Sequence, residues 1–207
     1  MSGRWRQERL KDEFHKLAKA SGYRSRAAFK LLQINRSYGL IKPGDSVLDL
    51  GSAPGGWLQV ASEIVGQAGR TVGVDIKNVE PLPTENVQVI QVDLLQQSSI
   101  DDIRRFLQKK QNAVLSDCSP NVSGVWEVDH ERQAELAFRS LEIARSCLIE
   151  KGSLIVKFFD GPRLHEFLRE LKKVFREVRI MKPKASKAKS AEVYIICKSF
   201  LGTVTKP

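Results

Sequence analysis

The chain has 207 residues, 42% of them hydrophobic and 28% charged, with a formal net charge of +10 at pH 7. These values suit one globular domain, and no apolar run approaches the roughly 20 residues that a membrane span needs. The opening MSGRWRQERLKDEF has no signal-like apolar core, and neither the three histidines nor Cys118, Cys147 and Cys197 have metal-site or disulfide spacing, so we expect a cytoplasmic protein.

The first 42 residues are predicted to be helical and basic. Residues 4–20 have the composition of a very polar helix, and Ser25 is placed to cap a second helix. The apolar face of that second helix follows a spacing near 3.6 residues, through Ala28, Leu31, Leu32 and Ile34. A turn at Pro43-Gly44-Asp45 then separates this extension from the rest of the chain.

The most informative stretch is VLDLGSAPGGWLQV, at residues 47–60. An apolar run ends in Asp-Leu-Gly, and a Ser-Ala-Pro-Gly-Gly turn leads into a helical spacing, as in the strand, loop and helix of a nucleotide-type pocket. The spacing of Gly51, Gly55 and Gly56 matches neither the G-x-G-x-x-G motif nor a P-loop, and a carboxylate before the loop would repel phosphates. A ligand with a positive charge and a ribose is favoured, and S-adenosylmethionine meets both demands.

Strands and helices alternate along the remaining core. Strands are predicted at 46–50, 71–75, 87–92, 113–116 and 153–158, and helices at 57–66, 99–110, 130–149 and 162–173. This alternation predicts an α/β fold with a parallel sheet covered on both faces. Two last strands, at 175–181 and 191–197, have no helix between them and are expected to pair as an antiparallel hairpin at the far side of the sheet.

Polar residues close the five predicted strands. These residues are Asp49, Asp75, Asp93, Asp117 and Lys157. Ligands of an open α/β sheet bind at the carboxyl ends of its strands, so we expect these side chains in one crevice. Asp75, about 20 residues after the glycine loop, is expected to accept hydrogen bonds from a ribose diol. Asp93 is a candidate acceptor for an adenine amine, and Trp57 either lines the pocket or packs in the core.

Basic residues are concentrated at both ends of the chain. Residues 1–42 carry 11 Lys/Arg against 3 Asp/Glu, residues 169–207 carry the same numbers, and residues 43–168 carry 12 against 18. Two basic ends are suited to binding a polyanion while the mildly acidic centre binds a smaller ligand. This distribution of charge indicates a nucleic acid as the partner. Lys184, Lys187 and Lys189, in the Lys/Ala/Ser segment at 182–191, are expected to contribute to this grip.

Several motifs together resemble one family. VLDLGSAPGGW, the strand end VDLL, LSDCSPN, and IVKFF with a later AEVY resemble the FtsJ/RrmJ family of ribosomal RNA ribose 2′-O-methyltransferases, in order and spacing and over almost the whole chain. The resemblance implies one domain over 1–207, with a basic helical extension at 1–42 before a Rossmann-like core at 43–207. It implies an S-adenosylmethionine-dependent methyltransferase fold, whose seven-stranded sheet is mostly parallel with an antiparallel last strand. Many relatives carry Met-Ala in place of Cys118-Ser119, a difference beside the motif that is not expected to change the chemistry.

The resemblance also implies the site residues. Its Lys-Asp-Lys-Glu catalytic tetrad falls, by motif, on Lys30, Asp117, Lys157 and Glu192. Its contacts to S-adenosyl-L-methionine fall on Gly55, Trp57, Asp75, Asp93 and Asp117. No metal is required for the displacement.

The tetrad also makes chemical sense by itself. A ribose 2′-hydroxyl is a very weak acid, so its attack on a sulfonium methyl group needs proton removal as the bond forms. An amine accepts that proton only where burial or a second ammonium lowers its proton affinity. Our hypothesis is that Lys157 is the base and that Asp117 orients it and the methyl donor. Lys30 supplies the second ammonium and, with Glu192, positions the ribose.

The substrate is left with alternatives. The favoured acceptor is a ribose, expected to be that of a uridine, in large-subunit ribosomal RNA or the large ribosomal subunit, and the enzyme is expected to be monomeric. The nearest alternative is the same chemistry on transfer RNA. A non-enzymatic alternative is an RNA-binding ribosome-assembly factor with a vestigial pocket, against which the complete tetrad argues. A small-molecule or protein methyltransferase would leave the basic ends unused.

Overall fold

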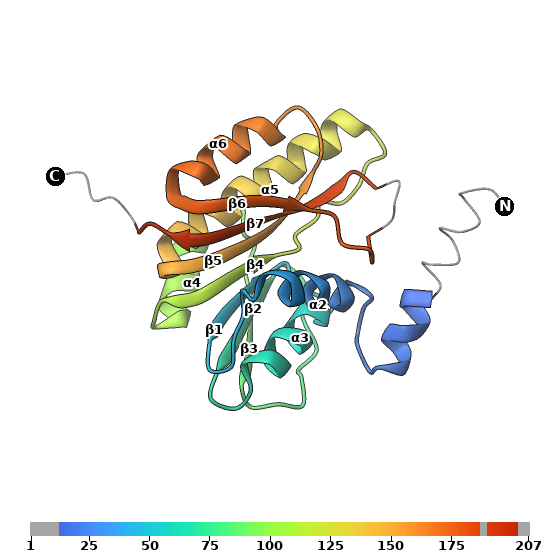
Figure 1. Cartoon of the computed structure of the whole chain (residues 1–207), viewed down its shortest axis with the longest axis vertical. Coiled ribbons are helices and arrows are strands. Elements are labelled where there is room, and N and C mark those ends of the chain that lie inside the picture. Colours follow the sequence, from blue (N-terminus) through green and yellow to red (C-terminus); the bar gives the residue numbers. More distant parts are fainter. Residues whose placement is uncertain (1–12, 187–189, 203–207) are drawn as a thin grey trace.

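The computed structural model describes residues 13–186 and 190–202, which contain a seven-stranded sheet in the order β3-β2-β1-β4-β5-β7-β6 (Figure 1). The strands are β1 Ser46–Leu50, β2 Arg70–Asp75, β3 Val87–Gln91, β4 Gln111–Ser116, β5 Leu148–Phe159, β6 Phe175–Met181 and β7 Glu192–Phe200. The helices are a segment at 13–20, then α2 Ala27–Tyr38, α3 Gly56–Val65, α4 Ser99–Leu107, α5 Trp126–Cys147 and α6 Leu164–Val174. The predicted α/β fold is confirmed.

Parallel pairing covers most of the sheet. β1 pairs with β2 and with β4, β2 pairs with β3, and β4 pairs with β5, all in parallel. β7 runs antiparallel to both of its neighbours, β5 and β6, which confirms the predicted hairpin at the far side of the sheet. Because β7 inserts beside β5, Tyr194 of β7 lies opposite Lys157 of β5 in the register. This pairing brings the end of the chain to the site.

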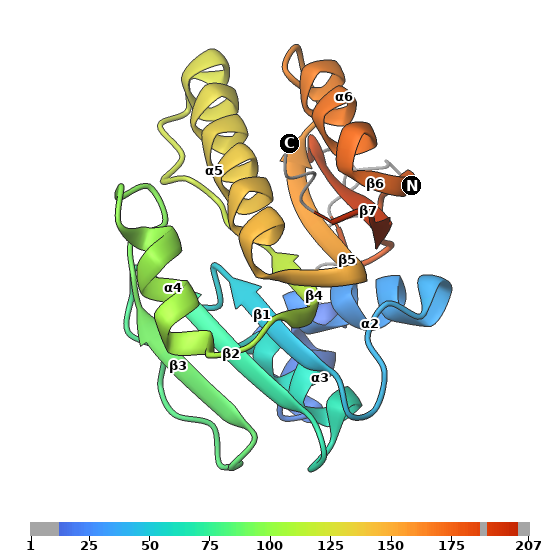
Figure 2. The same ribbon diagram turned by 90° about the vertical axis from the view of Figure 1, so that its left-hand side faces the viewer.

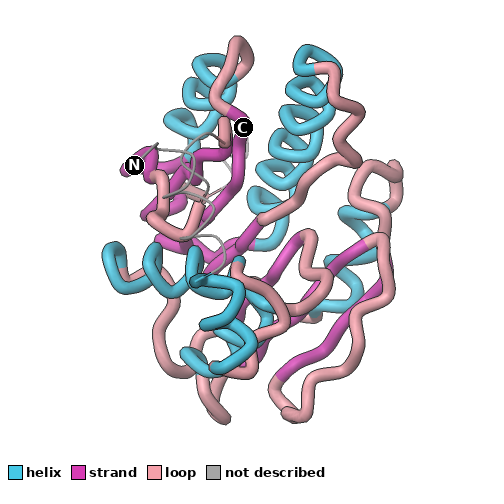
Figure 3. The backbone as a smooth tube through the Cα atoms, turned by 90° about the vertical axis from the view of Figure 1, so that its right-hand side faces the viewer, coloured by secondary structure: helices cyan, strands magenta, loops and turns pink. Residues whose placement is uncertain are grey.

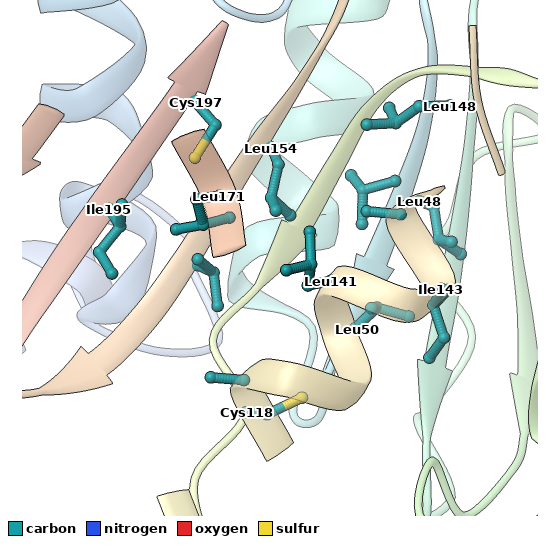
Figure 4. Packing of buried hydrophobic residues seen from close by; sticks show 14 of the residues in the cluster. Leu48, Leu50, Cys118, Leu141, Ile143, Leu148, Leu154, Leu171, Ile195 and Cys197 are labelled. Carbon is teal, nitrogen blue, oxygen red and sulfur yellow. The ribbon is translucent and has the colours of Figure 1, made fainter. Parts of the chain in front are cut away.

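Helices cover both faces of the sheet. α4, α5 and α6 lie on the face that Figure 2 presents, and α2 and α3 lie on the opposite face, nearer the viewer in Figure 3. Each face has its own apolar core. Leu48, Leu154 and Leu171 belong to the first of these cores, shown close up in Figure 4. Ile34, Val60 and Ile155 belong to the second, beneath α2 and α3.

The sequence pattern explains these elements. β1 is buried at every position because parallel strands are covered on both faces, so its residues read as an apolar run rather than an alternation. α6 buries Leu164, Phe167 and Leu171, a spacing that places all three on one side of a helix. α2 ends at Gly39, whose φ of 60° suits glycine and whose N–H donates to the carbonyl of Asn35.

Some boundaries differ from the expectations. α5 begins at Trp126 rather than at 130, and it ends at Cys147, where β5 starts without a turn residue between them. The first residue of β5 is fixed by long-range pairing with Gln111, which local sequence does not encode. α4 stops at Leu107, not 110, because Gln108 is left-handed with φ 60°.

The expected Ser25 cap is wrong. The residue before α2 is Arg26, and no side chain caps this helix. Ser25 instead packs against Gly56 at the start of α3, where a Cβ would collide with its hydroxyl. No helix in the described ranges is long and apolar enough to cross a membrane. Of the lysines expected to grip RNA, Lys187 and Lys189 lie outside the described residues.

Candidate active site

The glycine loop joins β1 to α3 and needs glycine for its backbone. Gly51 has φ +73° and Gly55 has φ +113°, in the region that residues with a Cβ rarely adopt. A Cβ on Gly51 would lie 2.7 Å from the sulfur of Cys118, and one on Gly55 would lie 2.9 Å from Nη1 of Arg24. These two glycines are therefore required by close approaches within the protein itself.

Arg24 holds this loop, a contact that the sequence reasoning missed. Its Nη1 donates to the carbonyl of Pro54 at 3.1 Å and to that of Glu80 at 2.6 Å, and its Nη2 donates to the carbonyl of Pro81 at 2.8 Å. One guanidinium thus ties the glycine loop to the segment after β2, using its fixed fork of donors. The N-terminal extension is thereby coupled to the loop.

The larger cavity at the carboxyl ends of the strands has a volume of about 680 Å³. Asp75, Asp93 and Asp117 all line it, as their strand-end positions predict. The two oxygens of Asp75 accept the N–H groups of Ala53 and Lys77, each at 2.8 Å, which fixes the orientation of the carboxylate. Each oxygen has a second lone pair, so a fixed acceptor remains for a ligand diol.

A smaller cavity of about 230 Å³ lies under α2. Arg26, Lys30 and Trp57 line it, and Gly51, Ala53 and Asp117 line both cavities. The indole N–H of Trp57 donates to the carbonyl of Ala27 at 2.8 Å, and the residue is only 3% exposed. Trp57 therefore both packs in the core and borders the small cavity, whereas Gly55 lines neither cavity.

The four residues of the expected tetrad lie in one network centred on Asp117. Asp117 follows β4, and its N–H donates to the carbonyl of Leu50 at the end of β1. Nζ of Lys157 lies 3.2 Å from Oδ1 of Asp117 and donates to its backbone carbonyl at 2.6 Å. Lys157 is 4% exposed and the side chain of Asp117 is 17% exposed, so this ion pair is largely shielded from water.

Tyr194 connects the two halves of the network. Its hydroxyl donates to Oδ1 of Asp117 at 2.6 Å and accepts from Nζ of Lys30 at 3.0 Å. Lys30 also pairs with Oε2 of Glu192 at 3.2 Å. Sequence reasoning missed Tyr194, although the signal was present: it stands two residues after Glu192 and so on the same face of a strand.

The network fixes its own protonation states. Burial would raise the pKa of Asp117, but the ammonium groups of Lys157 and Lys30 and the hydrogen bond from Tyr194 outweigh it and hold that pKa below its ordinary value. Burial, together with the charge and hydrogen bond of Asp117, raises the pKa of Tyr194 well above its ordinary value. Tyr194 is thus a permanent donor to an ionised Asp117. Burial also raises the pKa of Cys118 to about 12, which excludes a reactive thiolate.

Asp49 departs from the expected crevice. It is fully buried, lines neither cavity, and neither of its oxygens has a hydrogen-bond partner among the described residues. Leu50, not Asp49, ends β1, so the carboxyl group is held within the covered part of the sheet. Burial, and then the charges of Asp117 and Asp75, raise the pKa of Asp49 well above its ordinary value.

Replacing Asp49 by asparagine is expected to flatten the pH dependence of stability. The folded carboxyl keeps its proton above the unfolded pKa of about 3.9, so wild-type stability falls as pH rises from there towards the raised folded pKa. The free energy of unfolding of Asp49→Asn, measured relative to that of the wild type, should increase by up to about 1.4 kcal/mol per pH unit in that window. Urea unfolding at several pH values measures it. The exposed Asp101→Asn should run parallel to the wild type, as would Asp49→Asn if Asp49 were ionised.

The chain is similar to known proteins in both sequence and fold. The sequence model described as FtsJ-like methyltransferase matches residues 23–200. The chain is 45% identical over 202 residues to the Ribosomal RNA large subunit methyltransferase E of Methanocaldococcus jannaschii, covering 96% of this chain and 82% of that protein. A Plasmodium falciparum structure described as a ribosomal RNA methyltransferase superposes with a TM-score of 0.77 at 32% identity, over 87% of this chain and 100% of that chain. Aeropyrum pernix fibrillarin, solved with S-adenosyl-L-methionine, shares the fold, with a TM-score of 0.57 at 20% identity over 84% of this chain and 75% of its own.

Proposed function

The chain belongs to the FtsJ-like methyltransferase family, and we propose that it methylates a ribose 2′-hydroxyl, that of a uridine, in large-subunit ribosomal RNA. The observation that carries the proposal is the network of two lysines and two carboxylates joined through Tyr194, at the junction of the two cavities. The names of the relatives support the ribosomal substrate.

The cavities fit the methyl donor. S-adenosyl-L-methionine supplies, when bound, an electrophilic methyl group on a sulfonium. Asp75 and Asp93 of the larger cavity have acceptors suited to a ribose diol and an adenine amine. Arg26 of the smaller cavity suits an amino-acid carboxylate. Asp117 lines both cavities, so a positive centre between these two ends would meet its carboxylate.

Lys157 is the proposed proton acceptor; its ammonium first loses a proton, because only the neutral amine can accept one from the 2′-hydroxyl. Its amine lies against Asp117, which lines both cavities, and the backbone carbonyl of Asp117 fixes its direction; Lys157 itself lines neither cavity. The carboxylate of Asp117 also serves Tyr194, which in turn holds Lys30, so its charge is shared between two ammonium groups. Lys30 and Glu192, whose side chain is 24% exposed, are placed to orient the incoming ribose.

A methylation assay with mass-spectrometric mapping tests the reaction. The protein is incubated with labelled methyl donor and either large ribosomal subunits, free large-subunit RNA or transfer RNA. The expected result is label in large-subunit RNA, on a uridine that resists alkaline cleavage because its 2′-oxygen is blocked. Label on transfer RNA alone would show that the substrate is transfer RNA and not large-subunit ribosomal RNA. Label on a base, or on no RNA, would overturn the proposal.

The Lys/Ala/Ser segment is expected to hold RNA. Lys184 is exposed, and the adjacent Ala185 N–H donates to Oε1 of Gln33 in α2 at 3.4 Å, so this segment meets the basic N-terminal extension. Replacing Lys184, Lys187 and Lys189 by alanine should weaken RNA binding and reduce the slope of log K against log salt by about 2–3, while cofactor affinity is unchanged. Filter binding over a salt series measures this slope. A control that replaces the exposed Lys151, Lys172 and Lys173 by alanine should keep the wild-type slope. An unchanged slope in the variant of Lys184, Lys187 and Lys189 would show that this segment does not bind RNA.

A further inference from the structure

An exposed aromatic side chain lies beside the candidate active site. Trp126 is the first residue of α5 and is 43% exposed. Val122, Val125 and Val128 around it are 69%, 52% and 40% exposed. These four residues are called the Trp126 patch. A contiguous exposed apolar patch on a monomer commonly marks a binding site, since water contact with such side chains is unfavourable.

The ring of Trp126 is held in place by aromatic neighbours. It stacks on Phe159, with ring centroids 6.0 Å apart and planes 21° apart, and it lies 5.6 Å from the ring of His130. His130 is buried and accepts the N–H of Arg163 at 3.1 Å. A side chain fixed before binding loses little conformational entropy when a ligand covers it.

The loop before Trp126 is fixed as well. The carboxylate of Asp129 accepts the N–H and hydroxyl of Ser123, at 2.7 and 2.8 Å, and the N–H of Gly124 at 3.0 Å. These hydrogen bonds, first the one from the Ser123 backbone, hold the pKa of Asp129 below its ordinary value. The carboxylate therefore stays ionised and clamps the loop. Trp126 is presented from a rigid support rather than from a free loop.

The position of the patch relates it to the acceptor ribose. Phe159 stands two residues after Lys157 in β5 and pairs with Glu192 across the sheet. Two strand residues span about 6.6 Å along the backbone, and the ring of Trp126 stacks on that of Phe159 with a centroid separation of 6.0 Å. Trp126 is thus within the reach of a nucleotide that neighbours the one at Lys157. The patch is continuous with the candidate catalytic network through Phe159.

We propose that Trp126 is a stacking platform for an unpaired nucleobase of the substrate RNA, next to the methylated nucleotide. This inference rests on the proposed function in that RNA is the acceptor. Every base has a π-face that an indole can stack on, and the aliphatic valines offer no hydrogen-bond readout, so the platform accepts any base. Bases in a duplex have their faces covered, so the platform selects single-stranded RNA.

Binding of a short single-stranded oligoribonucleotide to wild type and variants tests the platform. Trp126→Ala is expected to raise the Kd by roughly five- to a hundredfold, the range for loss of one base–aromatic stack. Trp126→Phe keeps a π-face and should stay within about threefold of wild type, while Trp126→Leu should resemble the alanine variant. The same oligoribonucleotide with single abasic positions should show one position at which wild type and Trp126→Ala bind equally.

Two control variants separate stacking from general apolar contact. Val122→Ala removes exposed aliphatic surface from the same patch, and Ile180→Ala removes it from β6, where Ile180 is 48% exposed. Val122→Ala should weaken RNA binding by less than Trp126→Ala does, because a valine has no π-face, and Ile180→Ala should bind RNA as the wild type does. A Trp126→Phe variant as weak as Trp126→Ala, or a Val122→Ala variant equally weak, would overturn the platform. So would an unchanged Kd in Trp126→Ala.

The outcomes also separate this inference from the proposed function. Binding that depends on Trp126, without methyl transfer to any RNA, would support the platform and overturn the proposed reaction. Methyl transfer with the same KM for RNA in wild type and Trp126→Ala would do the reverse. The Tm of each variant identifies a folding defect, and Trp126→Leu, which keeps an apolar side chain beside Phe159 but has no π-face, decides the question if Trp126→Ala is unstable.

Discussion

Replacing Lys157 by alanine is expected to lower the rate of methyl transfer by about 10²- to 10⁴-fold, the usual contribution of a positioned general base. The 2′-hydroxyl is too weak an acid to attack without losing its proton, and the amine of Lys157 is held beside Asp117, which lines both cavities. Single-turnover methyl transfer with saturating RNA and cofactor measures the rate. Isothermal titration of S-adenosyl-L-methionine should give a Kd close to that of the wild type.

Two further variants distinguish a base from a simple cation. Lys157→Arg keeps the positive charge but stays protonated at all accessible pH values, so it should be as inactive as the alanine variant. Lys172→Ala removes an exposed lysine of α6 and should retain full activity. Near-wild-type transfer by Lys157→Ala with normal cofactor binding would remove Lys157 from the role of base. A fully active Lys157→Arg would leave it only an electrostatic role.

Local pattern was sufficient for most of the sheet. β6 has the predicted bounds 175–181, a short segment with the β-branched residues Val178 and Ile180 that follows a helical spacing. The start of β5 was not predictable in this way, since Leu148 is fixed by pairing with Gln111 of β4, a long-range contact that propensity does not encode. The start of α5 was not predictable from local sequence either, because no side chain caps this helix and Asp129 binds the preceding loop from within the helix.

The site residues that belong to a motif or stand at a strand end could be predicted from the sequence. Asp75, Asp93 and Asp117 follow from the rule that ligands lie at strand ends, and the structure brings all three to one cavity. Tyr194 was missed because a tyrosine in an apolar strand suggests only packing, and the antiparallel register opposite Lys157 gives it its partners. Arg24 was missed because its acceptors are backbone carbonyls, which have no sequence signature. The predicted bounds 46–50 of β1 are those observed, but Asp49 is the penultimate residue of this strand and so lies inside the covered sheet rather than at its end.

Replacing Asp117 by asparagine is expected to have the largest effect on stability, about 3–5 kcal/mol lost from the free energy of unfolding, together with loss of methyl transfer. The substitution leaves two buried ammonium groups, on Lys30 and Lys157, and among the described residues only Lys30 keeps a carboxylate partner, Glu192. Removing one partner of a buried pair leaves a charge that water cannot reach, which is why the penalty exceeds that of a surface pair. Urea unfolding at neutral pH measures the loss, and the exposed Asp160→Asn should show none of it.

The double variant Asp117→Asn/Lys157→Met tests the cause. Methionine has nearly the length of lysine without its charge, so the double variant should recover most of the stability but none of the activity. The pH dependence gives an independent test, because the pKa of Asp117 is lowered in the folded protein. Its contribution to stability is complete above the unfolded pKa of about 3.9 and disappears as pH falls through the lower folded pKa. The free energies of unfolding of the wild type and of Asp117→Asn should therefore converge only in acid. A constant difference across that range, or a double variant no more stable than Asp117→Asn, would show that Asp117 acts through packing and not through the charges that it balances.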